Sequence, residues 1–421
     1  MVKISTLLST YANYKAKLVL DDGSIFTGCG FGFPKDTAGE VVFNTGMVGY
    51  TEALSDPSYR GQILCMTYPL IGNYGVPSKN VLDEYGLPKY FESNDIQVRG
   101  LVIHQLSPVA SHWSCKRTLD EWLHEEKVPG IYNVDTREIT KKIRVKGVMK
   151  GAISVSEKFV DESRLLELMK HEVYDTQNFM SDVSIREPQH YGKNNNDKGC
   201  IVIIDTGIKF SIIRNVLRMG YNIVVVPWDT SFEKISQYKP RGVIISNGPG
   251  DPKICQPTIK TATKLIETST PTLGICLGNQ IIALAGGANT YKLKYGHRGQ
   301  NKSCLDNLNS QAYITSQNHG YGISLESLKD TDFKIWFSNS DDNTVEGILH
   351  KSKPILAVQF HPEASPGPYD CSFIFERFRE IIDRNSALSE DKYSSFKRDI
   401  HASKQVSYRK NKVNKKRRKI A

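Results

Sequence analysis

One cysteine lies where a strand-like segment meets a helix-like segment. The apolar run 272–275 predicts a strand, and residues 277–285 predict an amphipathic helix, with Cys276 between them. Gly274 and Gly278 allow a tight turn that would expose a nucleophilic side chain at the end of a sheet. The backbone N–H of Leu277 could then stabilise an oxyanion, and the positive end of the helix favours a thiolate. The expected chemistry is attack of a thiolate on a carbonyl carbon.

A thiol nucleophile needs a base, and the base needs a group that orients it. Among ten histidines, His361 directly follows the apolar run 355–360, which places it at the end of a strand. Glu363 is two residues further on, and in an extended segment these two side chains face the same side. Pro362 is expected to hold that extended geometry. A single histidine at a strand end is more often structural, so the pairing with Cys276 is what favours catalysis.

The order of these residues in the chain disfavours one familiar class of enzyme. Hydrolases of the α/β-hydrolase type place the acid between the nucleophile and the histidine. Here the acid comes last, two residues after the histidine. The residues therefore predict a Cys276–His361–Glu363 triad on a different scaffold.

The segments around Cys276 alternate between strand and helix. Strands are predicted at 200–205, 223–227, 242–246 and 272–275, and helices at 208–219 and 256–268. This alternation favours a parallel sheet, whose chemistry gathers at the carboxyl ends of the strands. The loop 246–252 follows one of these strands, and Gly248 and Gly250 would let main-chain N–H groups approach a substrate. A simple tight turn is the alternative interpretation of that loop.

The chain divides into three parts. Residues 1–190 contain strand patterns at 15–33, 40–44, 62–67 and 98–104 and helical patterns at 116–126, 136–146 and 162–171, which predicts a mixed α/β domain rich in strand. Polar residues at 186–198 predict a linker, and the parallel-sheet domain follows at 199–388, with further strands at 312–317 and 355–360 and a closing helix at 370–383. The fold class is α/β, and residues 389–421 form a tail.

Composition narrows the classes of protein further. No apolar run reaches the roughly 18 residues that a membrane helix needs, so no membrane association is expected. The eight cysteines contain no C-x-x-C pair, so neither a disulfide framework nor a metal site is expected. This usage fits a reducing compartment. The cytoplasm is the expected location, with an organelle as the alternative.

The net charge of +10 belongs entirely to the tail. The last 25 residues hold 11 lysines and arginines and one aspartate, so the rest of the chain is electrically balanced. Runs of like charge with little aromatic content are typical of solvated, disordered tails. We therefore favour a solvated tail over one that binds nucleic acid or an acidic partner. Retention on heparin or RNA with and without residues 397–421 distinguishes these alternatives.

Four motifs of the second half together resemble class I glutamine amidotransferases with a Cys–His–Glu triad. They are Gly274-Ile-Cys-Leu-Gly-Asn-Gln280, Ser246-Asn-Gly-Pro-Gly-Asp-Pro252, Gln317-Asn-His-Gly320 and Gln359-Phe-His-Pro-Glu-Ala-Ser-Pro-Gly-Pro368. The first half is more specific, and its motifs resemble the small (glutaminase) subunit of carbamoyl-phosphate synthase: Gly39-Glu-Val-Val-Phe-Asn-Thr-Gly-Met-Val-Gly-Tyr50, Asp56-Pro-Ser-Tyr59, Pro69-Leu-Ile-Gly-Asn-Tyr-Gly75 and Val134-Asp-Thr-Arg137. The resemblance covers residues 15–385.

The resemblance implies a role for each matching position. Cys276 would attack the side-chain amide of L-glutamine, and Leu277, Gly248 and Gly250 would surround the oxyanion. His361 would protonate the departing ammonia and then activate water against a glutamyl thioester, while Glu363 would orient His361. The remaining expected glutamine contacts are Gln280, Asn318, Gly320 and Tyr321.

The resemblance also implies a partner. Ammonia would pass to a large synthetase subunit that makes carbamoyl phosphate from bicarbonate and ATP, for arginine or pyrimidine synthesis. No cofactor is expected in this chain, because ATP and Mg²⁺ would bind the large subunit. A non-catalytic scaffold that regulates the synthetase is the alternative function.

Three departures from the family pattern concern activity or its regulation. Gly46 stands where bacterial members commonly carry a serine that contacts substrate, and Asn279 replaces the usual histidine beside the nucleophile. The basic tail matches no part of the family pattern. Because Asn279 lies outside the triad, we expect it to tune activity rather than abolish it.

Overall fold

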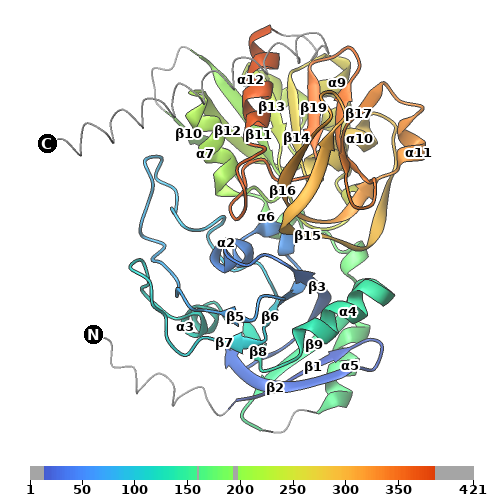
Figure 1. Ribbon diagram of the computed structural model, residues 1–421. Helices are drawn as coiled ribbons and strands as arrows, with labels where there is room; N and C mark the ends of the chain where they lie inside the picture. Colours follow the sequence, from blue (N-terminus) through green and yellow to red (C-terminus); the bar gives the residue numbers. More distant parts are fainter. Residues whose placement is uncertain (1–13, 159–160, 193–197, 385–421) are drawn as a thin grey trace, which may run out of the picture.

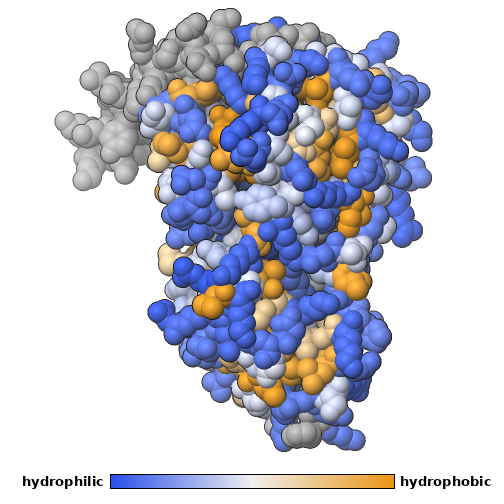
Figure 2. Space-filling model, turned by 90° about the vertical axis from the view of Figure 1, so that its right-hand side faces the viewer, coloured by the Kyte–Doolittle hydropathy of each residue, from blue (hydrophilic) through white to orange (hydrophobic). Residues whose placement is uncertain are grey.

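The computed structural model describes residues 14–158, 161–192 and 198–384 (Figure 1). The tail predicted at 389–421 lies outside these residues. Figure 1 shows two units, with the N-terminal half below and the C-terminal half above. Among the described residues no helix is long and apolar enough to cross a membrane. Figure 2 shows one face on which exposed hydrophobic side chains form separate groups among hydrophilic ones.

The N-terminal unit is built on a closed barrel. Its strands follow the order β1-β2-β8-β6-β4-β3-β9. Their bounds are β1 (Lys15–Leu20), β2 (Ile25–Gly32), β3 (Asp36–Asn44), β4 (Gln62–Met66), β6 (Gly100–Val102), β8 (Pro129–Tyr132) and β9 (Met149–Ser156). The sequence patterns predicted much strand here, but they did not predict β8, β9 or closure. Closure depends on pairing between distant segments, since β1 pairs with β9 as well as with β2.

Short helices and one small sheet complete this unit. They are α2 (Tyr50–Leu54), α3 (Leu119–Glu125), α4 (Thr136–Lys146), α5 (Glu162–Lys170), α6 (Met180–Val183) and the two-stranded pair β5 (Leu70–Ile71) and β7 (Gln105–Leu106). Alternate residues of the barrel strands enter two cores: Ile63 packs with residues of α4, and Leu64 packs with residues of α3. Helix α3 begins with a capping box between Thr118 and Glu121, which satisfies N–H groups that a helix start leaves without partners.

The C-terminal unit is a ten-stranded sheet in the order β10-β12-β11-β13-β14-β19-β18-β16-β15-β17. Strands β11 (Cys200–Asp205), β12 (Asn222–Pro227), β13 (Gly242–Ile245), β14 (Thr272–Ile275) and β19 (Ile355–Val358) are mutually parallel, as predicted. The other strands pair antiparallel: β10 (Gln189–Tyr191), β15 (Thr290–Asp306), β16 (Gln311–Ile323), β17 (Phe333–Asn339) and β18 (Val345–His350).

Two predictions for this unit need correction. Residues 189–191 were assigned to a linker, but they form β10 and pair with β12, because an edge strand needs only one partner and carries no long apolar run. The strand predicted at 312–317 is part of a long hairpin of β15 and β16. Its alternation is interrupted by two shifts of register, which obscure the period-two pattern.

Helices cover both faces of this sheet. They are α7 (Phe210–Arg218), α8 (Phe232–Gln237), α9 (Gln256–Glu267), α10 (Leu277–Ala285), α11 (Leu325–Leu328) and α12 (Phe373–Arg384). Along β11, Ile201 and Ile203 join the core formed with α7 and α12, whereas Val202 and Ile204 join the core formed with α9 and α10. This burial on two faces explains the continuous apolar run of β11.

The two units meet through buried charges. Arg214 of α7 bonds Asp83 at 2.7 Å (Nε to Oδ2) and Glu92 at 3.3 Å (Nη1 to Oε1). The Glu92 carboxylate also accepts a hydrogen bond from the Ser211 N–H at 3.0 Å. Buried pairs of this kind fix geometry, because removing one partner leaves an uncompensated charge. The contact therefore holds the barrel against the helix that precedes the site described next.

Candidate active site

The cysteine elbow has the predicted place but a different source of backbone strain. Cys276 joins β14 to α10 with φ 55° and ψ −102°, so the strained residue is the predicted nucleophile itself and not a glycine. The glycines serve close packing instead. A Cβ at Gly278 would lie 2.1 Å from the Ile245 carbonyl oxygen, and one at Gly274 would lie 2.6 Å from the Gly278 oxygen. Only glycine lets α10 approach the sheet this closely.

The thiol is enclosed rather than exposed, so the prediction of an exposed sulfur was wrong. Cys276 is 1% exposed, and its Sγ lies 3.6 Å from the main-chain oxygen of Asn318. It lines a pocket together with Leu277, Gln280 and Asn318. A buried thiol in the wall of a pocket can meet a substrate that enters the pocket.

His361 and Glu363 pair, but not in the way predicted. His361 Nδ1 lies 2.6 Å from Glu363 Oε1, and both side chains are buried. The backbone is a turn and not an extended segment, because the Ala364 N–H donates to the His361 carbonyl at 3.1 Å. The argument from a shared strand face was therefore wrong in its reason, although the two side chains do meet. In this turn the side chains of residues i and i+2, His361 and Glu363, still lie on the same side and meet.

The electrostatics of the pair favour an ion pair. Burial opposes the charge on His361, but the Glu363 carboxylate and the neighbouring Cys276 side chain raise the pKa of His361 to about 10. Burial likewise opposes the charge on Glu363, but Lys209 and His361 lower the pKa of Glu363 to about 2. Both groups are therefore charged near neutral pH. The ring's Nε2 has no short hydrogen bond to another described residue, and Cys276 is close enough to interact with the ring.

A buried lysine, which the sequence patterns did not single out, completes this group. Lys209 Nζ donates to Glu363 Oε1 at 3.0 Å and to the Ala364 carbonyl at 2.6 Å. Burial disfavours its charge, but Glu363, Glu92 and Asp56 raise the pKa of Lys209. A lysine at the start of a predicted helix is ordinarily solvated, so only its 2% exposure in the fold reveals it. Lys209 fixes the Glu363 oxygen that holds His361.

The pocket brings together all of the other predicted site residues. Its lining includes Gly248, Gly250, Leu277, Gln280, Asn318, Gly320 and Tyr321. Gly248 cannot be replaced without disruption, because a Cβ there would lie 1.9 Å from the Thr206 oxygen. The Gly278 N–H donates to the Ser246 carbonyl at 3.0 Å and so ties the elbow to the glycine loop. Gln280 Nε2 is occupied within the protein, where it donates to the Tyr321 carbonyl at 2.9 Å.

Charged residues in the pocket were also missed by the sequence patterns. Glu40, Lys292 and Arg298 line it, and Lys292 Nζ lies 2.6 Å from Glu40 Oε1. Arg298 is 4% exposed, and its Nε has no partner among the described residues. Glu40 belongs to the barrel, so both units contribute to this pocket. Groups of both signs suit a substrate that carries both an ammonium and a carboxylate.

The two departures within the described residues lie in different surroundings. Asn279 is fully buried, and its side chain donates to Gln359 Oε1 at 3.2 Å. Gln359 is two residues before His361 in the chain. Gly46 is not among the residues that line the pocket. A Cβ at Gly46 would lie 2.5 Å from Gln300 Nε2, so the Gln300 side chain fills the space that a larger residue would need.

Asp56 links the barrel unit to the pocket wall, and its loss is expected to weaken substrate binding. Asp56 Oδ2 accepts a hydrogen bond from Asn318 Nδ2 at 2.9 Å, and Oδ1 accepts one from the Ser58 N–H at 2.9 Å. In Asp56→Asn an amide replaces the carboxylate that orients Asn318. We expect the KM for glutamine to rise about tenfold, the effect of losing roughly 1.4 kcal/mol, with a smaller change in kcat.

Steady-state glutamate release against glutamine concentration measures this effect. Asp161→Asn is the matched control. Asp161 belongs to the same barrel unit as Asp56 and accepts the Ser163 N–H at 2.9 Å in the same kind of turn. An unchanged KM in Asp56→Asn would refute the orienting role.

Two family comparisons divide the chain where the fold does. Residues 18–153 match the carbamoyl-phosphate synthase small chain, CPSase domain, and residues 202–381 match glutamine amidotransferase class-I. The small chain of carbamoyl phosphate synthase from Pyrococcus furiosus is 49% identical over 88% of this chain and 98% of its own length. The α/β fold class and the parallel-sheet amidotransferase domain predicted from the sequence are confirmed.

Two further relatives carry this region inside much longer proteins. The human mitochondrial protein named carbamoyl-phosphate synthase [ammonia] is 45% identical over 91% of this chain and 24% of its own length. The multifunctional protein CAD of Squalus acanthias is 47% identical over 87% of this chain and 16% of its own length. With both domains matched and a relative aligned over almost its full length, this chain belongs to the carbamoyl-phosphate synthase small-chain family.

Proposed function

We propose that this chain hydrolyses L-glutamine to glutamate and ammonia through a thioester on Cys276. The observation that carries the proposal is the buried chain of contacts from Cys276 through His361 and Glu363 to Lys209. Membership of the family does not by itself choose the nitrogen source, because one relative is named for ammonia. The pairing of His361 with Glu363 beside Cys276 is what favours glutamine as the nitrogen source.

The reaction would begin with the thiolate of Cys276. Its sulfur attacks the γ-carbonyl carbon of glutamine, and the N–H groups of Leu277 and of the 248–250 loop stabilise the negative oxygen. The tetrahedral adduct collapses when the imidazolium of His361 gives a proton to the departing nitrogen, which leaves as ammonia. The neutral imidazole then takes a proton from water, and the hydroxide attacks the thioester to release glutamate.

The charges around His361 suit both halves of this cycle. An imidazolium stabilised by Glu363 is ready to donate a proton to the leaving group. Glu363 stays ionised because Lys209 and His361 neutralise it. Lys209 would therefore act as a positioning residue that keeps the acid and the base aligned.

The ammonia would be used by a large synthetase subunit. We propose this partner because the matched relatives are named as small chains or carry this region inside longer synthases. ATP and Mg²⁺ would bind to that subunit, which would combine ammonia with bicarbonate to give carbamoyl phosphate. The product could serve arginine or pyrimidine synthesis, and the CAD relative favours pyrimidines as the first pathway to examine.

Trapping the intermediate tests the proposed chemistry. The chain, in complex with its large subunit, is mixed with glutamine and quenched in acid within milliseconds to seconds, and the peptide containing Cys276 is examined by mass spectrometry. We expect a glutamyl adduct on Cys276 that disappears after hydroxylamine treatment. A complex that releases glutamate without any adduct would contradict the thioester, and one that neither releases glutamate nor forms an adduct would favour the regulatory scaffold.

A further inference from the structure

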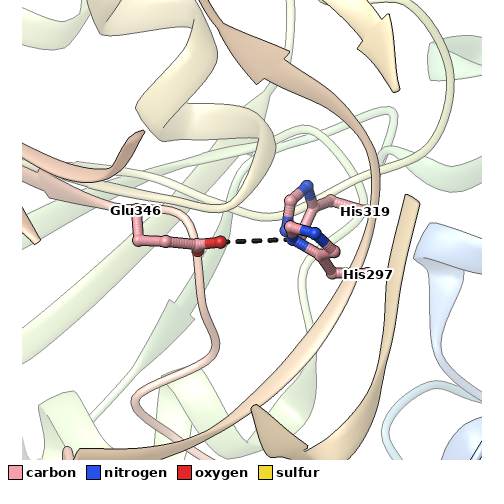
Figure 3. A group of neighbouring side chains, drawn as sticks. All are labelled: His297, His319 and Glu346. Carbon is pink, nitrogen blue, oxygen red and sulfur yellow. Dashed lines mark ion pairs between the residues drawn. The ribbon is translucent and has the colours of Figure 1, made fainter. Parts of the chain in front are cut away.

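Three potential metal ligands meet at the edge of the pocket, outside the triad, and one of them, His319, is part of the pocket lining. His297 lies on β15, His319 on β16 and Glu346 on β18, and they are 4%, 6% and 0% exposed. One ligand atom from each lies within 4.8 Å of the others. Figure 3 shows the Glu346 carboxylate directed at His297, with the His319 ring beside it. Buried histidine and glutamate side chains nearly always have a hydrogen-bond partner or another bound group for each polar atom.

His319 contributes a nitrogen with no partner. Its Nδ1 lies 2.8 Å from the Tyr321 carbonyl oxygen, so Nδ1 must carry the proton that it donates. The other nitrogen, Nε2, then holds a lone pair, and it is buried with no hydrogen bond to any described residue. A neutral imidazole whose one nitrogen is fixed by a carbonyl and whose other nitrogen presents a lone pair is the form that binds metals.

His297 is held in the matching orientation. Its Nε2 lies 2.8 Å from Asp342 Oδ2, and its Nδ1 lies 3.2 Å from Glu346 Oε1. Without an ion, a proton on Nδ1 satisfies its contact with Glu346, and a bound metal would displace that proton and join the nitrogen to Glu346 and His319. A carboxylate behind a ligating histidine is the usual outer support of a metal site. The two imidazole rings are nearly perpendicular, with an interplanar angle of 88° and centroids 5.0 Å apart.

Glu346 is also fixed by its surroundings. Asn339 Nδ2 donates to Glu346 Oε1 at 3.0 Å, and Gln317 Nε2 donates to Glu346 Oε2 at 3.1 Å. The Thr344 hydroxyl also donates to Oε1, at 3.4 Å, so these groups set the orientation of the carboxylate and leave a lone pair on Oε2. Outer hydrogen bonds of this kind are typical of carboxylates that bind a metal.

We propose that His297 Nδ1, His319 Nε2 and the Glu346 carboxylate bind one divalent transition-metal ion, with Zn²⁺ the best match. Two nitrogens and one carboxylate form a known zinc ligand set, and water would complete a tetrahedron. The proposal departs from the sequence-based expectation of no metal site. No short spacing signals it, because its ligands come from three strands that only the fold brings together.

The ion would have a structural role in the pocket. Residues 318–321 line the pocket, and His319 is part of that segment. A metal shared by β15, β16 and β18 would fix this segment from behind. The inference concerns metal binding, so it stands or falls independently of the thioester chemistry.

Metal content of the purified full-length chain tests the proposal. The protein is prepared without a histidine tag, stripped with a chelator, and titrated with Zn²⁺ against a chromogenic competitor and with Co²⁺ in the visible range. We expect about one Zn²⁺ per chain and Co²⁺ absorption typical of four-coordinate nitrogen and oxygen ligands. In His297→Gln and Glu346→Gln the Zn²⁺ affinity should fall at least about tenfold.

His350→Gln is the matched control. His350 lies on β18, the same strand as Glu346, and is 4% exposed, but its Nδ1 accepts the N–H groups of Ser352 and Lys353 instead. Its Zn²⁺ affinity should equal that of the unchanged protein. Glu346→Gln conserves size, so it reports on the site even where His297→Gln fails to fold. Absence of stoichiometric Zn²⁺ and of a Co²⁺ spectrum in the unchanged protein would overturn the proposal, as would equal affinity in Glu346→Gln.

Discussion

Cys276→Ala in the complex with the large subunit should lose glutamate release from glutamine by roughly 10⁴-fold or more, the scale seen when a covalent nucleophile is removed. The physical reason is that no other side chain replaces the sulfur: Cys276 lines the pocket and its side chain neighbours the His361 ring. Carbamoyl phosphate synthesis from added ammonium ions should persist, because that reaction does not need the thiol. Coupled assays of glutamate and carbamoyl phosphate measure both outcomes.

Cys255→Ala is the control for this experiment. Cys255 is a buried cysteine of the same unit, 1% exposed, at the start of α9 and outside the pocket lining. Its replacement should leave glutamate release close to that of the unchanged complex. Equal glutamate release from Cys276→Ala and the unchanged complex would end the catalytic assignment.

Lys209→Met should reduce both stability and activity. The methionine leaves the Glu363 carboxylate buried beside His361 without its second cation, and breaking a buried pair typically costs about 3–5 kcal/mol of unfolding free energy. Loss of the hydrogen bond to Glu363 Oε1 also releases the oxygen that orients His361. We expect kcat for glutamine hydrolysis to fall about 100-fold, the scale of losing one fixed electrostatic contact.

Denaturant unfolding and steady-state kinetics separate the two effects of this substitution. A positioning role predicts that kcat falls while the KM for glutamine changes little, and that the pH profile of kcat shifts because the pKa of Glu363 rises. Lys353→Met is the matched control, since within the described part of the chain Lys353 Nζ bonds a main-chain carbonyl, that of Ile266 at 2.9 Å, and no carboxylate. An unaltered kcat in folded Lys209→Met would refute the positioning role.

The sequence alone predicted the residues that we propose as nucleophile, base and acid, because each carries a local signal. Cys276 is marked by its glycines, and His361 by its place after an apolar run. The strands β11 to β14 were predicted for the same reason, since a strand buried on both faces is a continuous apolar run. The i and i+2 spacing of His361 and Glu363 gave the right pair for the wrong reason, because a turn replaces the extended segment.

Residues whose role depends on distant partners were not found in this way. Lys209 and Arg298 have ordinary sequence surroundings, and Asp56 stood out only as part of a family motif, with no role assigned. Lys209 gains its role when the C-terminal unit folds and brings it to Glu363, and Asp56 gains its role when the barrel unit meets Asn318. Barrel closure has the same origin, because β1 and β9 pair across more than a hundred residues. Residue patterns report the burial of neighbours along the chain, but they carry no information about which distant segment supplies a partner.

What the sequence determined by itself is the chemistry: a thiol at an elbow, an imidazole at a strand end and a carboxylate beside it, in an α/β chain with a balanced body and a basic end. What only the tertiary structure decided is the electrostatic setting of that chemistry. Burial strengthens each charge–charge contact, so the Lys209–Glu363–His361 group acquires its charge states from the fold. The same enclosure gathers His297, His319 and Glu346 from three strands, which no linear spacing could reveal.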